Sequence, residues 1–318
     1  MTARLPTVGV DIGGSKIGVG LIDHDGRIVS HQQTPTPALE GAEAILSAAR
    51  TTIRNVVGRR PIGAVGIGAA GVIGPPGIVV AATGLLTGWA GTDIVGGIRH
   101  ELRSDGIDCP VVAVNDVHAH GAGEASWGAG AGKDLVLLIA VGTGLGGAVI
   151  HRGLPLIGAN GASGHLGHIR CPEAVGLPCS CGAIGHLEAV ASGYGLVQLY
   201  HHLGGDKSIS SAHELSRRVL TDETAFTALS RSAAALGAAI GDLINIVDPD
   251  LVVISGSVSQ AGSMWWRELR IAAAETCLNV TTDTPIVPAM LGEHAGVIGA
   301  ATLAARIAAE QESQCQND

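Results

Sequence analysis

The chain has few aromatic and few charged residues. Only one Phe, two Tyr and four Trp occur among its 318 residues, and 15% of the residues are charged. Nucleic-acid binding is not expected, because few aromatic rings are present to stack on bases and the formal net charge is −9. Hydrophobic residues make up 46% of the chain, so a sizeable core must be built from Ala, Val, Ile and Leu.

The sequence also lacks a targeting segment at its start, since no long apolar stretch precedes Asp11. Residues 61–92 carry no charge and are more numerous than the ~20 needed to span a bilayer. They are rich in glycine, however, and contain the sequence GPPG at 74–77. This pattern predicts two short buried strands around a turn rather than a membrane helix. We expect a cytoplasmic protein that does not associate with membranes.

Glycine, by contrast, is abundant, with 48 residues, and many glycines lie between apolar runs. Residues 8–22 (VGVDIGGSKIGVGLI) and 135–150 (LVLLIAVGTGLGGAVI) share one pattern of apolar run, glycine-rich turn and apolar run, which predicts two related β-hairpins. The repeat indicates a duplicated core, with one glycine loop from each domain facing a shared cleft. Alternation of strand and helix patterns makes the chain α/β. Strands are expected at 64–73, 110–114 and 251–254, helices at 41–57, 187–203, 212–219, 232–247 and 300–309, and a frayed tail from 311.

The two glycine loops are candidates for phosphate binding, because backbone N–H groups without Cβ crowding can approach phosphate oxygens closely. Either loop by itself is also compatible with an ordinary tight turn. Together, with Asp11 at the first and Thr143 at the second, they favour a nucleoside triphosphate. The second loop also satisfies G-x-G-x-x-G, but a strand pattern follows it where a dinucleotide-binding site requires a helix and then an acidic residue.

Two further groups of polar residues stand out. Asn115-Asp116 follows a predicted strand, where α/β proteins place working groups, although Asn-Asp is also a common helix N-cap. Cysteine and histidine cluster between 165 and 188, which favours a zinc site over a disulfide in a reducing compartment. The expected ligands, a closed structural set, are His168, Cys179, Cys181 and His186. Cys171 is a competing ligand, and reduced cysteines without metal are the alternative.

Taken together, these motifs resemble the ROK family of sugar kinases and sugar-responsive regulators, in the sugar kinase, actin and Hsp70 superfamily. Residues 11–16 (DIGGSK) are similar to the family's D-I-G-G-T-K motif, 142–147 match G-T-G-x-G-G, and Asn115-Asp116 matches its N-D pair. The resemblance covers nearly the whole chain. It implies an α/β, two-lobed actin-like ATPase (ribonuclease H-like) fold with a duplicated core and a cleft between the lobes. The smaller lobe would comprise 1–117 plus about 298–318, and the larger about 118–297 with the zinc-binding loop.

The resemblance also implies roles for individual residues. Asp116 would be the catalytic base for a sugar hydroxyl, and Asn115 would hold neighbouring hydroxyls. The family's sugar and zinc signature extends substrate contacts to His165, His168 and Glu188. ATP, used with Mg²⁺, would be bound by Asp11, Gly13, Gly14, Ser15, Lys16, Gly142, Thr143, Gly144, Gly146, Gly256 and Gly296.

Besides Ser15 in place of Thr, three positions depart from the family pattern. His165 replaces a glutamate that contacts the sugar, and an imidazole offers one acceptor and one donor where a carboxylate accepts from two hydroxyls. The sequence GHLGH at 164–168 is similar to G-H-I-G-H of bacterial N-acetylmannosamine kinases. His186 replaces the last zinc cysteine, and Leu85 replaces a sugar-side Asn near the sugar's C3. We therefore expect ATP-dependent phosphorylation of the 6-hydroxyl of a hexose or amino-hexose, with N-acetylmannosamine or kanosamine favoured and glucose next.

Two other functions fit the family. A sugar-responsive regulator would carry an N-terminal helix-turn-helix domain, and we expect none because only ten residues precede Asp11. A non-catalytic sugar sensor would be expected to lose Asp116 or a phosphate loop, and both are present. The partners expected are therefore the sugar and ATP, in a homo-oligomer such as a dimer or tetramer.

Overall fold

The computed structural model describes residues 5–315, and it describes their side chains as far as residue 310. The described chain separates into two compact units. Unit 1 contains the residues up to Gly132, the segment 149–163 and the residues from Glu293 onward, and unit 2 contains 133–148 and 164–292. The boundaries expected from the sequence were near 117 and 297, and no return of 149–163 to the first unit was expected.

Unit 1 is built on a five-stranded sheet of order β3-β2-β1-β4-β7. β1 is antiparallel to β2, β2 is antiparallel to β3, and β4 and β7 run parallel to β1. The strands are β1 (Thr7–Ile12), β2 (Lys16–Ile22), β3 (Ile28–Pro35), β4 (Val65–Ala69) and β7 (Val111–Asn115). A separate hairpin pairs β5 (Val72–Gly74) with β6 (Ile78–Ala81), around the turn expected at the GPPG sequence.

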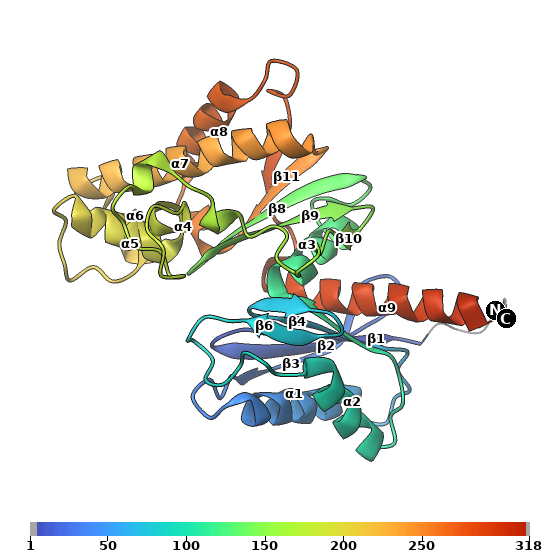
Figure 1. Ribbon diagram of the computed structural model, residues 1–318. Coiled ribbons are helices and arrows are strands. Elements are labelled where there is room, and N and C mark those ends of the chain that lie inside the picture. The colour runs from blue at the N-terminus through green and yellow to red at the C-terminus, as the bar shows by residue number, and fades with distance from the viewer. Residues whose placement is uncertain (1–4, 316–318) are drawn as a thin grey trace. The chain divides into compact units, whose positions relative to one another are not determined.

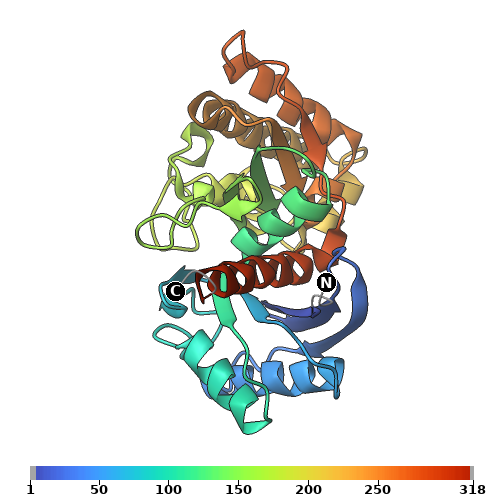
Figure 2. The same cartoon turned by 90° about the vertical axis from the view of Figure 1, so that its right-hand side faces the viewer.

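Helices cover both faces of this sheet, as Figures 1 and 2 both show. α1 (Ala42–Val57) and α2 (Ile94–Ser104) lie against one face, and α3 (Asp116–Trp127) and α9 (Ala295–Cys315) lie against the other. α9 approaches so closely that a Cβ at Gly9 of β1 or Gly66 of β4 would overlap a backbone carbonyl of the helix. The core between the layers consists mainly of buried Val, Ile and Leu side chains.

The packing of α3 on α9 explains why the first segment of unit 1 extends to Gly132. A Cβ at Gly123 or Gly299 would overlap the backbone of the facing helix, so α3 and α9 are in direct backbone contact. The segment 149–163 joins the same unit because β10 (Leu154–Pro155) packs on α3 and Arg306 donates to the Arg152 carbonyl at 2.7 Å. These contacts join segments distant in sequence, and no local pattern predicts them.

Unit 2 repeats the strand plan of unit 1. Its sheet has the order β10-β9-β8-β11-β12, the unit boundary falling within β9, and β8, β11 and β12 are parallel. The strands are β8 (Leu135–Val141), β9 (Leu145–His151), β11 (Leu251–Ser255) and β12 (Ile286–Pro288). The helices are α4 (Glu188–Ala191), α5 (Gly193–His202), α6 (Ala212–Arg218), α7 (Glu223–Val247) and α8 (Ser263–Thr276). The expected α/β class and duplicated core are thus confirmed.

Four predicted elements differ from the structure in their limits. The helix expected over 187–203 is interrupted at Ser192, whose hydroxyl caps α5 by accepting from the Gly195 N–H at 2.9 Å. α7 begins earlier than expected, at an Asp222 N-cap. The strand expected over 64–73 is split at Gly71, which has a φ of +107°. α9 starts before 300 and continues to Cys315, past the expected start of the tail.

Among the described helices, none combines the length and hydropathy required to cross a bilayer.

Candidate functional site

The first glycine loop joins β1 to β2 in unit 1. The Gly13 N–H donates to the Lys16 carbonyl at 3.1 Å, closing the turn. Thr36, next to the end of β3, supports it from one side, because its hydroxyl donates to the Gly13 carbonyl at 2.8 Å and its N–H donates to the Ser15 carbonyl at 3.0 Å. Gly14 and Ser15 are exposed, and a Cβ built at Gly14 would meet nothing within 4 Å. The outer side of the loop is therefore open to a ligand.

Two carboxylates interact electrostatically beside this loop. Asp11 lies at the penultimate position of β1, and Asp116 begins α3 directly after β7. Burial raises the pKa of Asp11 to about 6, and the nearby Lys16 ammonium partly opposes this. Burial and then the charge of Asp11 raise the pKa of Asp116 to about 7, while hydrogen bonds from Val117 and Asn115 oppose the shift. Asp116 therefore exchanges its proton near neutral pH, as a general base must.

Asn115 forms the helix cap that was the alternative interpretation of the Asn-Asp pair, and it also orients its neighbour. Its Oδ1 accepts from the Val117 and His118 N–H groups at 2.9 and 3.3 Å, which caps α3. Its Nδ2 donates to the Gly71 carbonyl and to Oδ1 of Asp116, both at 2.8 Å. Oδ1 of Asp116 also accepts the Val117 N–H at 2.9 Å. Two hydrogen bonds thus fix one oxygen of this carboxylate.

The second glycine loop, Gly142-Thr143-Gly144, joins β8 to β9 in unit 2. The start of α5 holds it, because the Gly193 N–H donates to the Gly142 carbonyl at 2.8 Å and the Tyr194 N–H donates to the Thr143 carbonyl at 3.2 Å. Thr143 and Gly144 are exposed, and Gly146 follows within β9. This loop resembles the first in backbone plan, but it contains no charged side chain.

The two glycines expected near the adenosine lie in different units. Gly256 follows β11 in unit 2 with a φ of +91°, and its Cβ would overlap the Val141 carbonyl just before the second loop. Gly296 lies in the first turn of α9 in unit 1, and its Cβ would be 2.8 Å from Oδ2 of Asp11. A side chain at Gly256 would overlap backbone, whereas one at Gly296 would press on the Asp11 carboxylate, so each glycine permits a close approach beside a loop assigned to phosphate.

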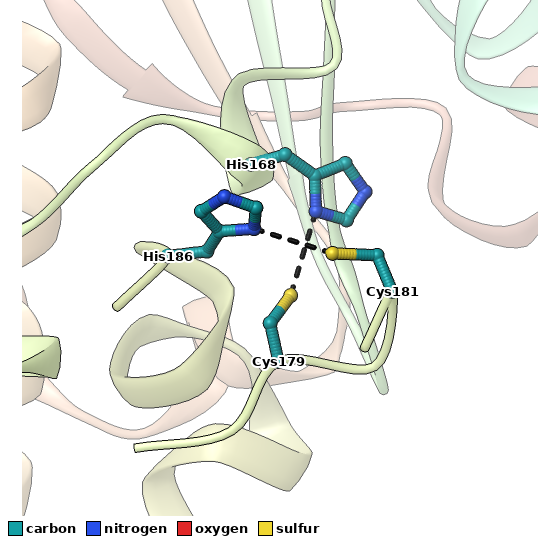
Figure 3. Close-up of side chains that lie close together, drawn as sticks. All are labelled: His168, Cys179, Cys181 and His186. Atoms are coloured by element: carbon teal, nitrogen blue, oxygen red, sulfur yellow. Dashed lines mark hydrogen bonds between the residues drawn. The ribbon is translucent and has the colours of Figure 1, made fainter. Parts of the chain in front are cut away.

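The four expected zinc ligands lie together in unit 2. Their ligand atoms are all within 4.8 Å of one another, and Figure 3 shows the four side chains converging. Sγ of Cys179 is 3.5 Å from Nδ1 of His168, and Sγ of Cys181 is 3.3 Å from Nδ1 of His186. Ligand bonds of about 2.0–2.3 Å in a tetrahedral zinc site separate neighbouring ligand atoms by about 3.3–3.8 Å. The donor set and its spacing therefore fit zinc.

Cys171, the competing ligand, lies outside this group. Its thiol donates to Oε2 of Glu173 at 3.1 Å, and it is not among the four side chains whose ligand atoms converge. The ring of His165 stacks on that of His168 with centroids 6.2 Å apart. The carboxylate of Glu188, the first residue of α4, is buried against both the second glycine loop and the C-x-C segment.

Sequence reasoning missed three residues of this site. Glu293 pairs with Lys16 at 2.7 Å, Thr36 supports the first loop, and Ser180 donates its hydroxyl to Glu188. Ser180 lies inside the C-x-C motif, so its proximity to the metal ligands was a signal. Glu293 lies close before Gly296 in sequence and Thr36 lies outside every motif, and only the folded chain brings them to Lys16 and Gly13.

Comparison with known proteins agrees with this architecture. A model of the ROK family matches residues 7–307. A glucokinase of Streptomyces coelicolor is 33% identical, covering 94% of this chain and 97% of its own. An N-acetylmannosamine kinase of Escherichia fergusonii is 31% identical, covering 94% and 98%. The crystal structure of a ROK family glucokinase from Streptomyces griseus, in complex with glucose and AMPPNP, superposes with a TM-score of 0.78 at 31% identity, covering 95% and 99%.

The two repeated sheets and their glycine hairpins define a two-lobed α/β protein of the actin-like class. Within that class, the chain belongs to the ROK family.

Proposed function

We propose that this protein is an ATP-dependent sugar kinase that transfers the γ-phosphoryl group to the 6-hydroxyl of a hexose or amino-hexose. The observation that carries the proposal is Asp116, which follows β7 directly and whose pKa is raised to about 7. A carboxylate of that pKa can accept the hydroxyl proton at neutral pH as the oxygen attacks phosphorus. Relatives named glucokinase and N-acetylmannosamine kinase support the reaction class.

The proposed nucleotide contacts come from both glycine loops. In each unit, exposed backbone N–H groups of the loop bind phosphate oxygens, and Lys16 adds a positive charge in unit 1. Asp11 is the residue proposed to hold Mg²⁺, directly or through water. The cation would stabilise the ionised form of a carboxylate whose pKa burial raises to about 6, and when bound it supplies charge neutralisation for the triphosphate.

For the sugar, Asn115 and Asp116 are proposed to contact hydroxyls from unit 1, and His165, His168 and Glu188 from unit 2. An amino-hexose such as N-acetylmannosamine or kanosamine is favoured over glucose, because the imidazole of His165 presents one acceptor and one donor where a carboxylate accepts twice. Since His168 and Glu188 also belong to the metal cluster and its surroundings, a structural zinc at His168, Cys179, Cys181 and His186 would fix the side chains that contact the sugar.

A coupled ADP-release assay tests this function. The purified chain is given ATP and Mg²⁺ with glucose, mannose, glucosamine, N-acetylglucosamine, N-acetylmannosamine or kanosamine in turn. We expect sugar-dependent ADP release, greatest with an amino sugar, and a 6-phosphorylated product by mass spectrometry and NMR. Sugar binding without ADP release would instead identify a sensor or regulator, and release independent of sugar would identify an ATPase.

A further inference from the structure

Glu188 uses both oxygens of its carboxylate inside unit 2. Oε2 accepts the backbone N–H of Leu145, the first residue of β9, at 3.0 Å. Oε1 accepts the hydroxyl of Ser180 and lies 3.4 Å from Sγ of Cys179. Glu188 is 8% exposed, so its bond from Leu145 is shielded from competing water, whereas the bond from the exposed Ser180 is only partly buried. The carboxylate therefore connects the C-x-C segment directly to the second glycine loop.

The chain on either side of Glu188 strengthens this connection. His186, one of the four candidate ligands, precedes it by two residues, and Gly193 and Tyr194 follow it and bond to the carbonyls of Gly142 and Thr143. A Cβ at Gly144 would lie 3.0 Å from Oε2 of Glu188, so little free space separates loop and carboxylate. The segment 186–194 thus contains one candidate metal ligand and also contacts the second glycine loop along its length.

We propose that Glu188 is a positioning residue for the second glycine loop, through which metal binding at the Cys/His cluster sets the geometry of residues 142–145. With metal bound, Cys179 and Cys181 fix the exposed segment that carries Ser180, and Ser180 fixes Glu188. Without metal, Ser180 is no longer constrained and the bond from Leu145 loses its anchor. The inference rests on the proposed function only for the identity of the ligand that the loop binds. If metal binding raises the affinity for nucleotide, nucleotide binding must raise the affinity for metal by the same factor, because the two binding equilibria are linked.

The first experiment measures hydrogen–deuterium exchange in the full-length protein, without nucleotide or turnover. Samples are compared as purified with zinc, after chelation, and after zinc is added back. We expect exchange in peptides covering 142–147 to accelerate about 5-fold or more on chelation and to recover with zinc, since a loosened loop opens more often. Peptides covering 12–16 should not change and serve as the internal control. Equal exchange at 142–147 with and without zinc would overturn the proposal.

The second experiment removes one contact and keeps the metal ligands. Ser180→Ala should retain about one zinc per chain, the content of a four-ligand site, while the KM for ATP rises about 3- to 10-fold. The kcat should change less than about 2-fold, and the KM for sugar, which Glu188 is also proposed to contact, should rise less than the KM for ATP. Ser216→Ala is the matched control, because that exposed hydroxyl of unit 2 donates only to the His213 carbonyl. A wild-type KM for ATP, or a rise confined to the sugar KM, would contradict the proposal.

Substitutions of Glu188 itself provide a rescue test in the zinc-replete protein. Glu188→Ala removes both bonds and should accelerate exchange at 142–147, whereas Glu188→Gln keeps an oxygen for Leu145 and an amide for Ser180 and should restore exchange to within about 2-fold. Wild-type exchange in Glu188→Ala would overturn the role. If Glu188→Ala does not fold, Ser180→Ala still tests whether Glu188 positions the loop.

Failure of the wild type to phosphorylate any sugar would refute the proposed function. The exchange measurements would still show whether metal binding affects residues 142–147.

Discussion

The two glycine hairpins share a backbone plan and differ in charge. When their loops are aligned, Asp11 and Lys16 of β1–β2 correspond to Ala140 and Leu145 of β8–β9. The first hairpin therefore carries its own carboxylate and ammonium, whereas the second carries neither and receives a carboxylate from Glu188. The comparison teaches that the two hairpins share an exposed glycine turn, whereas a carboxylate and an ammonium flank only the first.

The loops also differ in how they are held. Thr36 supports the first loop and leaves Gly14 open, whereas the second loop is held by bonds donated by Gly193 and Tyr194 and by one that Glu188 accepts from Leu145. We infer that unit 1 supplies the proton chemistry and unit 2 supplies a neutral backbone site whose geometry depends on the metal cluster. The predictions below test this division, beginning with the largest expected effect.

Replacing Asp116 should have the largest effect, because unit 2 offers no second base in its hairpin. Asp116→Asn is expected to lower kcat by at least ~100-fold, in the range of general-base loss, with the fold unchanged by circular dichroism. Asp108→Asn is the matched control, since Asp108 lies in the same unit and its side chain pairs with Arg103 at the surface. Turnover close to wild type in Asp116→Asn would remove this residue from the mechanism.

The raised pKa of Asp116 predicts two pH dependences. Activity requires the ionised base, so kcat/KM should fall about 10-fold per pH unit below about pH 7. Between about pH 4 and 7 the native state keeps a proton that the unfolded state has released, so the free energy of unfolding should decrease as pH rises. Urea unfolding at pH 5 and pH 8 should show that Asp116→Asn reduces this decrease. An identical pH slope in variant and wild type would show that Asp116 does not titrate as described.

On the unit 2 side, the role of His165 is tested by sugar preference. His165→Glu should shift the ratio of kcat/KM values toward glucose by about 10-fold, since leaving one buried polar group unpaired costs about 1–3 kcal/mol. The exposed His202 of the same unit offers the control His202→Glu, which should leave the ratio unchanged. Unchanged sugar preference in a folded His165→Glu variant would assign this ring to packing against His168.

A pair of alanine substitutions compares the two loops directly. Neither Gly14 nor Gly144 has a positive φ, so the space around each decides the outcome. Gly14→Ala should change the free energy of unfolding by no more than ~0.5 kcal/mol, whereas Gly144→Ala should lower it by about 1 kcal/mol because its Cβ presses on Glu188. Equal stabilities by urea denaturation would show that the loops are held equally.

The smallest effect is expected for the ion pair of the first loop. Glu293→Gln removes the 2.7 Å contact with Lys16, but both side chains are about half exposed, at 49% and 59%. Loss of such an exposed pair should leave the free energy of unfolding nearly unchanged, and high salt should screen the contact further. A larger loss in thermal unfolding would mean that the first loop depends on a distant carboxylate as much as the second does.

The sequence predicted those parts of the molecule that local chemistry determines. Apolar runs around glycines identified both hairpins, and Cys and His at close spacing identified a cluster that the fold brings within 4.8 Å. Contacts between distant segments could not be predicted, because the pairing of Lys16 with Glu293 depends on where α9 begins. Helix interruptions also escaped prediction, since the apolar pattern continues through Ser192 although its hydroxyl caps a new helix.

The close packing of α9 on β1 and β4 has a consequence for the order of folding during synthesis. Gly9 and Gly66 are synthesised early, but the helix whose backbone they contact is translated only after the whole of unit 2. At synthesis rates of about 5–20 residues per second, the unit 1 sheet waits roughly 10 s or more with one face covered by α3 but not yet by α9. The later part of the chain can therefore complete its core first, which reverses the order in which the ribosome delivers the two units.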